Sequence, residues 1–592
     1  MLLLNILMSK ANAIGDFFFL RSEDMQKNPT HNHLASDYVP LVHEYLIEQI
    51  TKRLQTGIPF SVFHDGCTNG AENFCINARY VLNGEISTVV LRLCRCKTSL
   101  NAEEIVALLV KTVMEHPPDA IERVRDPDNR GGYGLRPSQV AVIGHDRAGS
   151  NERAMGNTQT FFVAPAIFSN ADSIGCWSHT ATHAAEKIST ACTLFAAFWH
   201  LVVGTMSRSG KAKESYRKFT GHTWIRWSKT RWFGERDAIL EAQPLVEDGQ
   251  FQGWIFASEF DFTDSAEESQ YNKLRRTMCP TLWGRTSDDN TAPADEALRK
   301  LAEEKWFMIR FEMMLIVELT AALRRLTYNA EGNGPLALVI YDEYDLVRLE
   351  FLLTYAELSF PGVKRLIAEK QATTADEEEK QQIKDDLIQY GKVRYKPAID
   401  YFEDHFSVEP TDDTAGAPLF KSLQMFKGAR LCNPDFMRKL ALTAGLNATI
   451  TEAMVSFRSM KILTLIPEMY KADEEGLRSE LPAYIAACAY IDYGNLGSDN
   501  KSPFKEKLEC LVEFWKKPSS DFPTWRKLAH YLFLFQPSVA CVDRGFSMLR
   551  LILLRPGMNS ALVDLIEATL MEMYNTSMTD AEMLEELLQR GL

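Results

Sequence analysis

The stretch Phe60–Cys96, FSVFHDGCTNGAENFCINARYVLNGEISTVVLRLCRC, decides the fold of this 592-residue chain. Three of its segments, 60–65, 73–82 and 86–96, are rich in branched and apolar residues, which is typical of β-strands. The dipeptide Asn83-Gly84 separates the last two segments, and it is a strong signal for a β-hairpin. We therefore expect three consecutive strands that form a meander.

Strands and helices then alternate. A helix is expected over 102–115, and SQVAVIGH at 138–145 has the continuous apolar character of a buried strand. A fifth strand is expected at 171–176, followed by one long helix over 179–203. Three meander strands followed by strands separated by helices predict a mixed sheet.

Helical periodicity dominates residues 206–515, most clearly at 306–326, 342–358 and 454–470. The charge-rich stretch 372–386 is interpreted as a solvated helix or linker. This middle region is therefore expected to be mainly helical, unlike the strand-rich part before it.

The C-terminal region returns to compact helices, expected at 524–535, 541–554 and 560–574. The last of these has an apolar face at helical spacing. Its residues are Leu562, Leu565, Ile566, Leu570 and Met573. Such a face packs either on its own domain or on another copy of the chain, so it is a candidate for self-association.

The composition is that of an ordinary globular protein, with 46% hydrophobic and 24% charged residues. A net charge of −14 argues against a chain that coats nucleic acid uniformly, although it leaves room for a local basic groove. The 11 cysteines have no metal-finger spacing, and a chain of this size does not need a disulfide scaffold.

No membrane-spanning segment is predicted. The apolar run at the N-terminus stops at Met8, which is short for the core of a signal peptide. The apolar stretch 306–326 contains Arg310, Glu312 and Glu318, which are costly in lipid, so it is interpreted as a buried helix.

Two aspartates stand at the ends of predicted strands, Asp65 and Asp146. Neighbouring strand ends can bring two carboxylates together, and such a pair repels and favours a cation such as Mg²⁺ or Mn²⁺. A third carboxylate from a helix would complete a two-metal site for phosphoryl transfer. Asp-Gly at a strand end is also ordinary turn chemistry, and these residues alone favour that interpretation over catalysis.

Five short motifs extend this pattern along the chain. They are Asp65–Thr68, Asp146 with Asn151, Cys176–His179, Thr230–Trp232 and Ser538–Ser547. In this order they resemble motifs of the hAT superfamily of DNA transposases, and the last closely resembles the C-terminal dimerisation segment of that family.

The resemblance implies an α/β plus all-α protein, in which a large all-α insertion domain interrupts an RNase H-like mixed sheet. The expected parts are an N-terminal helical extension at 1–55, the first part of the RNase H-like domain at 56–205, the insertion at 206–515, and the completion of that domain with the dimerisation region at 516–592.

Roles for individual residues also follow from the resemblance. Asp65, Asp146 and Asp543 would hold two divalent metals, Mg²⁺ or Mn²⁺, for attack by water or a 3′-hydroxyl on a DNA phosphodiester. The expected partners are DNA and a second copy of the chain, and the expected location is the nucleus, otherwise the cytoplasm.

Trp232 is a candidate for stacking on a displaced DNA base, with a core tryptophan as the alternative. Cys176, His179 and His183 are three candidate zinc ligands, but the sequence offers no evident fourth ligand. A packing role is therefore expected for Cys176 and His179.

The sequence departs from the family in three ways. Asp543 stands where the family has Glu, Cys67 replaces an aromatic residue, and the 64 residues before Asp65 lack the spacing of a BED-type zinc finger. We expect that the finger is lost or that the gene is a partial copy. The expected function is therefore a transposase or, alternatively, a catalytically silent transposase-derived protein that acts as a dimerising scaffold; an RNase H-type nuclease unrelated to transposition is a minor alternative.

Overall fold

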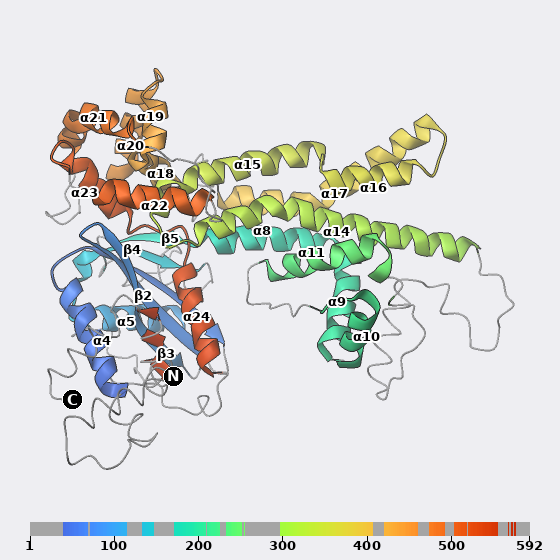
Figure 1. Ribbon diagram of the computed structural model, residues 1–592, viewed down its shortest axis with the longest axis horizontal. Coiled ribbons are helices and arrows are strands. Elements are labelled where there is room, and N and C mark those ends of the chain that lie inside the picture. Colours follow the sequence, from blue (N-terminus) through green and yellow to red (C-terminus); the bar gives the residue numbers. More distant parts are fainter. Residues whose placement is uncertain are drawn as a thin grey trace, which may run out of the picture. The chain divides into compact units, whose positions relative to one another are not determined.

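The computed structural model forms two compact units (Figure 1). The first contains residues 1–178, 329–343 and 406–592, and the second contains 179–328 and 344–405. The structure describes residues 39–68, 72–96, 98–114, 133–146, 168, 171–208, 210–224, 233–251, 254, 296–406, 420–459, 473–491, 503–517, 519–553, 566, 567, 570, 571, 574 and 575.

The first unit is built on a five-stranded mixed sheet, as the sequence predicted. Its strands are β1 (Phe60–Thr68), β2 (Glu72–Leu82), β3 (Glu85–Cys96), β4 (Val140–His145) and β5 (Asp172–Gly175). They lie in the order β3-β2-β1-β4-β5. The β1–β2 and β2–β3 pairs are antiparallel, whereas β4 runs parallel to β1 and β5 runs parallel to β4.

Two positions show why this sequence forms this sheet. Asn83 and Gly84 connect β2 to β3 with φ values of 53° and 80°, in the left-handed region that Asn and Gly tolerate. Gly144 in β4 lies against the Phe63 ring of β1, and a Cβ atom at Gly144 would come within 2.4 Å of that ring. The sheet therefore requires a residue without a side chain at this position.

Helix α24 (Ala540–Leu553) packs on β1 and β2. Asn77 Nδ2 donates to Cys541 O (3.1 Å), and Arg79 Nε donates to Phe533 O (2.7 Å). The side chain of Tyr80 points to the opposite face, because successive residues of a strand alternate. On that face helix α4 (Val39–Leu54) contributes Arg53, whose Nη1 donates to Tyr80 Oη (3.2 Å).

Side chains from residues 567 and 575 cover β3, one of the two edge strands of the sheet. Val90 N donates to Asn575 Oδ1, and Leu93 N donates to Glu567 Oε1; each donor–acceptor distance is 2.8 Å. Asn575 and Glu567 are 7% and 2% exposed. Backbone groups that would otherwise lack a strand partner are thus satisfied by side chains.

The first unit also contains a group of helices outside the sheet. Its helices are α5 (Ala102–Val113), α18 (Phe420–Ala429), α19 (Pro434–Leu440), α20 (Leu446–Ser459), α21 (Glu474–Cys488), α22 (Pro503–Lys516) and α23 (Pro523–Leu532), with 3₁₀ turns at Pro137–Gln139, Leu336–Leu338 (η4) and Arg430–Cys432. Trp515 Nε1 donates to Cys432 O (2.9 Å), which joins α22 to the last of these turns. Residues 406–515, which the sequence placed in the insertion domain, group with the sheet in the first unit. The predicted domain limits themselves stay predictions.

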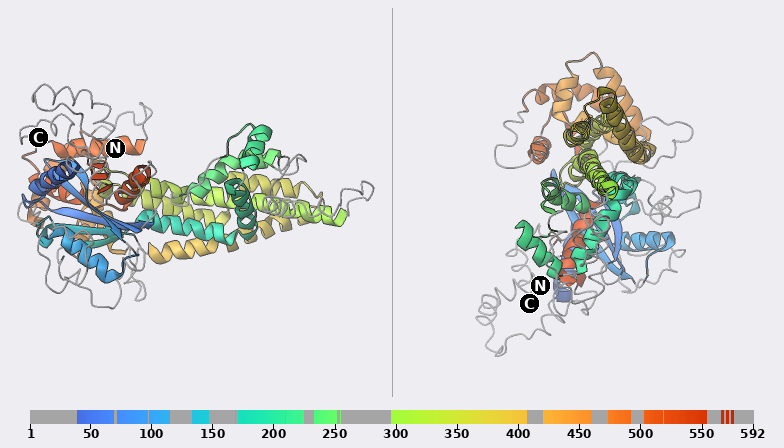
Figure 2. Two further views of the ribbon diagram at one scale, coloured as in Figure 1. Left: turned by 90° about the horizontal axis from the view of Figure 1, so that it is seen from below. Right: turned by 90° about the vertical axis from the view of Figure 1, so that its right-hand side faces the viewer.

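The second unit is helical. Its helices are α8 (Trp177–Ala191), which begins in the first unit, α9 (Thr193–Arg208), α10 (Gly210–Thr220), α11 (Gly234–Glu247), α14 (Glu296–Ala330), α15 (Ile340–Glu357), α16 (Pro361–Gln371) and α17 (Glu377–His405). The long helices α14 and α17 run side by side (Figures 1 and 2), and Arg394 of α17 pairs with Glu312 of α14 at 2.7 Å.

The prediction of a single helix over 179–203 is wrong. Helices α8 and α9 meet at a bend of 97° around Cys192. The physical reason lies in α14, where Glu312 Oε2 accepts a hydrogen bond from Phe195 N (2.8 Å). This buried carboxylate satisfies an amide in the first turn of α9, which stabilises a new helix start.

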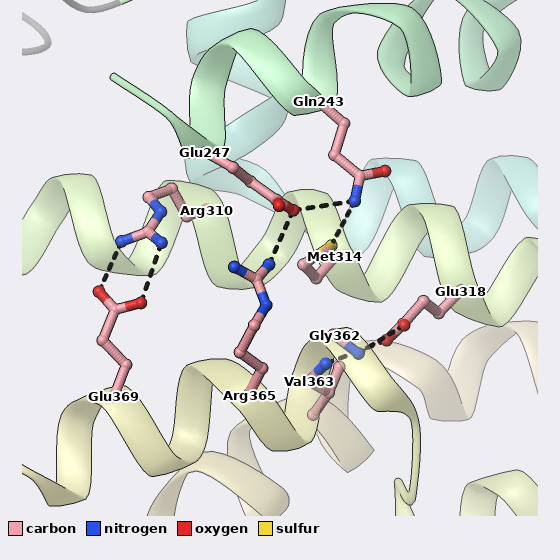
Figure 3. A network of polar contacts seen from close by, with 9 residues as sticks. All are labelled: Gln243, Glu247, Arg310, Met314, Glu318, Gly362, Val363, Arg365 and Glu369. Carbon is pink, nitrogen blue, oxygen red and sulfur yellow. Dashed lines mark hydrogen bonds and ion pairs between the residues drawn. The ribbon is translucent and has the colours of Figure 1, made fainter.

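Helix α14 contains the predicted buried helix 306–326, and its charged residues have partners within the second unit. Glu318 accepts hydrogen bonds from Gly362 N (2.7 Å) and Val363 N (3.0 Å) at the start of α16 (Figure 3). Arg310 Nη1 donates to Glu369 Oε1 (2.7 Å). Within the described residues no single helix is long and apolar enough to cross a membrane; the bent pair α8 and α9 meets the criteria only by length and composition.

Candidate metal centre

Two aspartates lie side by side where β1 and β4 approach their C-terminal ends. Asp65 belongs to β1, and Asp146 directly follows β4. Because His64 pairs with His145 in this parallel register, the next residue of each chain segment falls at the same level of the sheet. The structure thus brings together the two carboxylates that the sequence singled out.

A third carboxylate, Asp543, reaches this place from the first turn of α24. The start of this helix is held at Cys541, whose carbonyl oxygen accepts hydrogen bonds from Asn77 Nδ2 (3.1 Å) and Tyr574 Oη (2.7 Å). More than 390 residues separate Asp543 from Asp146 in the sequence, and packing of α24 on the sheet closes that separation.

Burial and mutual repulsion alter the acidity of this carboxyl cluster. The pKa of Asp65 lies well above its usual value, first because of burial and then because of the charges on Asp146 and Asp543. Burial and the charge of Asp146 raise the pKa of Asp543 to about 7, against the lowering effect of Arg544. Like charges held this close favour a shared proton or a bound cation.

The donor atoms of the cluster fit a divalent cation. Asp543 Oδ2 is buried and accepts no hydrogen bond from any described residue. One oxygen of the neighbouring carboxylate is held in place, because Gly66 N donates to Asp65 Oδ1 (2.7 Å). A buried carboxylate oxygen without a donor is costly, and coordination to Mg²⁺ or Mn²⁺ would offset that cost.

His179 was singled out by the sequence for its Cys-x-x-His spacing. It lies in the first turn of α8, and the division into compact units assigns it to the second unit. Its ring centroid lies 6.4 Å from that of His183 in the same helix. The packing role expected for His179 stays a prediction.

Cys176, the other member of that motif, has a different environment. Its side chain is 1% exposed, and its sulfur accepts a hydrogen bond from Val539 N (3.5 Å). The contact joins the end of β5 to the segment that leads into α24.

A loop of the first unit holds the residue next to Asp543. Arg544 donates from Nη1 to Glu331 O (2.8 Å) and from Nη2 to Asn333 Oδ1. Arg79 of β2 donates to the same loop, from Nη1 to Asn333 O (3.0 Å) and from Nη2 to Gly334 O (2.8 Å). The loop between α14 and η4 is therefore bound both to the sheet and to the start of α24.

Two buried histidines immediately precede the aspartates, which the sequence interpretation overlooked. His64 and His145 are both 0% exposed, and their rings stack with centroids 6.0 Å apart. His145 contacts Asp146 O through Nδ1 (2.5 Å) and Ser173 Oγ through Nε2 (2.9 Å). Burial lowers the pKa of His64 to about 3, so its ring is neutral at physiological pH.

The remaining predicted residues are those of the C-terminal apolar face and Trp232, the candidate for stacking on a DNA base. Trp232, Leu562, Leu565 and Met573 lie outside the described residues. Ile566 and Leu570 are 2% and 0% exposed in the single chain. These two side chains already pack within their own unit, so self-association through this face stays a prediction, and packing on its own domain is the interpretation that fits them.

Comparison with protein-family models finds no match for this chain, and comparison with curated proteins finds none either.

Proposed function

We propose that this protein cleaves and joins DNA strands in a metal-dependent reaction, at an RNase H-like site of the hAT transposase type. The observation that carries the proposal is the meeting of Asp65, Asp146 and Asp543 at one place on the sheet. The strand order β3-β2-β1-β4-β5, with three antiparallel strands followed by two parallel ones, supports the RNase H-like assignment. The resemblance of five sequence motifs to that family supports it further.

The three aspartates would hold Mg²⁺ or Mn²⁺, which supplies Lewis-acid stabilisation of the phosphate and a more acidic bound hydroxyl. Gly66 fixes the orientation of Asp65, and Arg544 fixes the helical turn that carries Asp543. Positioning at this scale matters, since an error near 1 Å can cost about 100-fold in rate. The expected substrate is duplex DNA, and the expected site of action is the nucleus.

The proposal is tested by nicking and strand transfer on a DNA duplex with the purified full chain in Mg²⁺ or Mn²⁺. We expect Asp65→Asn and Asp146→Asn each to lower the rate by about 1,000-fold or more, because each removes a metal-binding charge. Asp521→Asn is the matched control, since Asp521 is an exposed residue of the same unit. Activity that survives both substitutions would remove the catalytic assignment.

A catalytically silent, transposase-derived protein is the second candidate, and one observation favours it. Asp543 stands in the place where the family has Glu, and its side chain is one methylene shorter, so its carboxylate has less reach toward a shared metal. The same assay separates the candidates, because the silent protein nicks no duplex with either metal. An RNA–DNA hybrid included as a substrate would reveal the third alternative, an RNase H-type nuclease.

A further inference from the structure

The second unit contains a cavity that the proposed DNA chemistry does not use. Its volume is about 310 Å³, which falls in the range of small-molecule sites. Its lining combines two aromatic rings, Tyr216 and Trp224, with one carboxylate, Glu241. We propose that this cavity binds a methylated ammonium group, the chemistry shared by choline and the side chain of a trimethylated lysine.

A fixed turn brings part of the lining into place. Helix α10 ends at Thr220, and Gly221 follows with a φ of 74°, in the left-handed region that commonly ends helices. Gly221 N donates to Arg217 O (2.9 Å), and His222 N donates to Thr220 Oγ1 (3.2 Å). The residues 222–224, all of which line the cavity, therefore leave the helix in a defined direction.

The two aromatic rings form adjoining walls at a right angle. The centroids of the Tyr216 and Trp224 rings lie 5.6 Å apart, and their planes are inclined by 89°. Tyr216 is 3% exposed, and the Trp224 ring also contacts Trp199 of α9, with centroids 5.7 Å apart. The faces of such rings carry negative electrostatic potential, so walls of this kind attract an organic cation.

The charge in the lining favours the same sign of ligand. Glu241 of α11 is exposed, and among the described residues its carboxylate has no hydrogen-bond or ion-pair partner. The described lining contains no lysine or arginine. Burial raises the pKa of Tyr216 to about 12, and the nearby charge of Glu241 adds to this effect. The phenol therefore stays uncharged, and Glu241 supplies a negative charge that a bound cation would compensate.

The apolar part of the lining selects a methylated cation over a plain one. Ala238 and Ala242 are 6% and 3% exposed and offer methyl groups instead of side-chain acceptors. A primary ammonium carries three donors, and each one left without an acceptor in a partly buried site is costly. A trimethylammonium group has the same charge and no N–H donor, so aromatic faces, methyl groups and one carboxylate satisfy it.

The experiment compares choline with its neutral isostere dimethylbutanol, in which carbon replaces the charged nitrogen. Binding of each to the full chain is measured by saturation-transfer-difference NMR. We expect choline to bind about fivefold more tightly than the isostere, because only choline gains from the ring faces and the carboxylate. A short peptide with one trimethylated lysine, compared with choline, distinguishes a protein tail from a free small molecule as the source of the group.

Substitutions locate the binding in this cavity. Glu241→Gln should raise the dissociation constant of choline about fivefold and that of the isostere less than about twofold. Trp224→Ala should weaken choline binding about tenfold, and Trp224→Phe should restore most of it because a ring face remains. Glu357→Gln is the matched control, since Glu357 is an exposed glutamate of α15 in the same unit and does not line the cavity. Circular dichroism checks that each variant folds.

Three results would overturn the inference. They are a folded wild type that binds no choline up to about 10 mM, equal binding of choline and the isostere, and choline binding that is unchanged in both Glu241→Gln and Trp224→Phe or Trp224→Ala. None of these results bears on DNA cleavage, because the cavity lies in the second unit and the three aspartates lie in the first. Each proposal can therefore fail without the other.

Discussion

Buried carboxylates occur in both units of the molecule, and they differ in how their charge is compensated. In the second unit, Glu312 is 0% exposed and accepts hydrogen bonds from Arg394 Nε (2.7 Å), Tyr390 Oη (2.6 Å) and Phe195 N (2.8 Å). In the first unit, Asp65 and Asp543 are brought together with another carboxylate, and their pKa values are raised.

The difference separates structural acids from candidate functional ones. A buried charge with three donors is satisfied by the fold itself, and its removal exposes the partners that it held. A cluster of buried acids that repel one another costs stability in the absence of a cation, and folds retain such strain mainly at functional sites. Four substitutions and one pH series test this contrast.

The largest effect is expected at Glu312. Glu312→Ala should lower the free energy of unfolding by about 3–5 kcal/mol, because Arg394 would keep a largely buried charge without its partner. The measurement is chemical unfolding of the full chain. Glu378→Ala on exposed α17 is the matched control and should change stability by less than about 0.5 kcal/mol. A loss below about 1 kcal/mol for Glu312→Ala would show that Glu312 does not stabilise the fold as a structural acid, and the contrast would fail.

The contribution of the acidic cluster to the free energy of unfolding should fall as pH rises, which is the opposite of what a stabilising ion pair of a carboxylate does. The pKa of Asp543 is about 7 in the folded chain and about 3.9 when unfolded. Its contribution to stability is therefore fully present below about pH 4 and is lost as pH rises through about 7. Chelated protein should lose about 2–3 kcal/mol of stability over this window from Asp543, after allowance for its partial exposure.

Asp543→Asn sharpens this measurement, since an amide does not titrate. The difference in unfolding free energy between wild type and variant, measured with chelator from pH 4 to 8.5, should grow with pH in favour of the variant. Saturating Mn²⁺ at pH 8 should reverse the sign, because the wild type then gains binding energy. Parallel pH profiles of the two proteins would show that Asp543 is not part of the coupled cluster.

A smaller effect is expected at Gly144, two residues before Asp146. Gly144→Ala should destabilise the first unit by about 1–3 kcal/mol, since the new methyl group collides with the Phe63 ring. Gly210→Ala is the control, because a Cβ atom there meets nothing within 4 Å. Mn²⁺ binding to the same variant tests whether the metal site depends on this packing. A weaker Mn²⁺ affinity in Gly144→Ala would show that β4 cannot shift without moving Asp146.

The smallest effect is expected at Asn575, a buried but uncharged group of the first unit. Asn575→Ala should cost about 1–2 kcal/mol, because the amide and carbonyl groups of Val90 lose their partner. Asn447→Ala, at an exposed position of α20, should be neutral in the same unfolding assay. If Asn575→Ala also left the free energy of unfolding unchanged, the hydrogen bonds of Asn575 to Val90 would not contribute to the stability of this unit.

Local patterns in the sequence predicted the sheet well. Branched residues and the Asn83-Gly84 turn indicated the meander, and the apolar run before Asp146 indicated a buried strand that proved to be parallel to β1. The nearness of Asp65 and Asp146 followed from strand ends alone. These features depend on neighbours in sequence or on one strand pairing, which pattern reasoning can reach.

Features that depend on distant partners were not predictable in this way. The bend at Cys192 depends on Glu312, more than 100 residues away, because that carboxylate holds the first turn of α9. The start of α8 depends on Pro537 and Ser422, which hold Trp177 although they lie more than 240 residues further along the chain. Spacing along the sequence does not reveal which side chains face one another in space.

The side chains that cover β3 have a consequence for how copies of this protein avoid one another. An uncovered edge strand offers a row of backbone donors and acceptors to any passing strand, and it is a common starting point for aggregation. Glu567 and Asn575 occupy these groups at Leu93 and Val90. A chain cut before residue 566 would expose that row, so it should aggregate by strand pairing at concentrations at which the full chain stays dispersed.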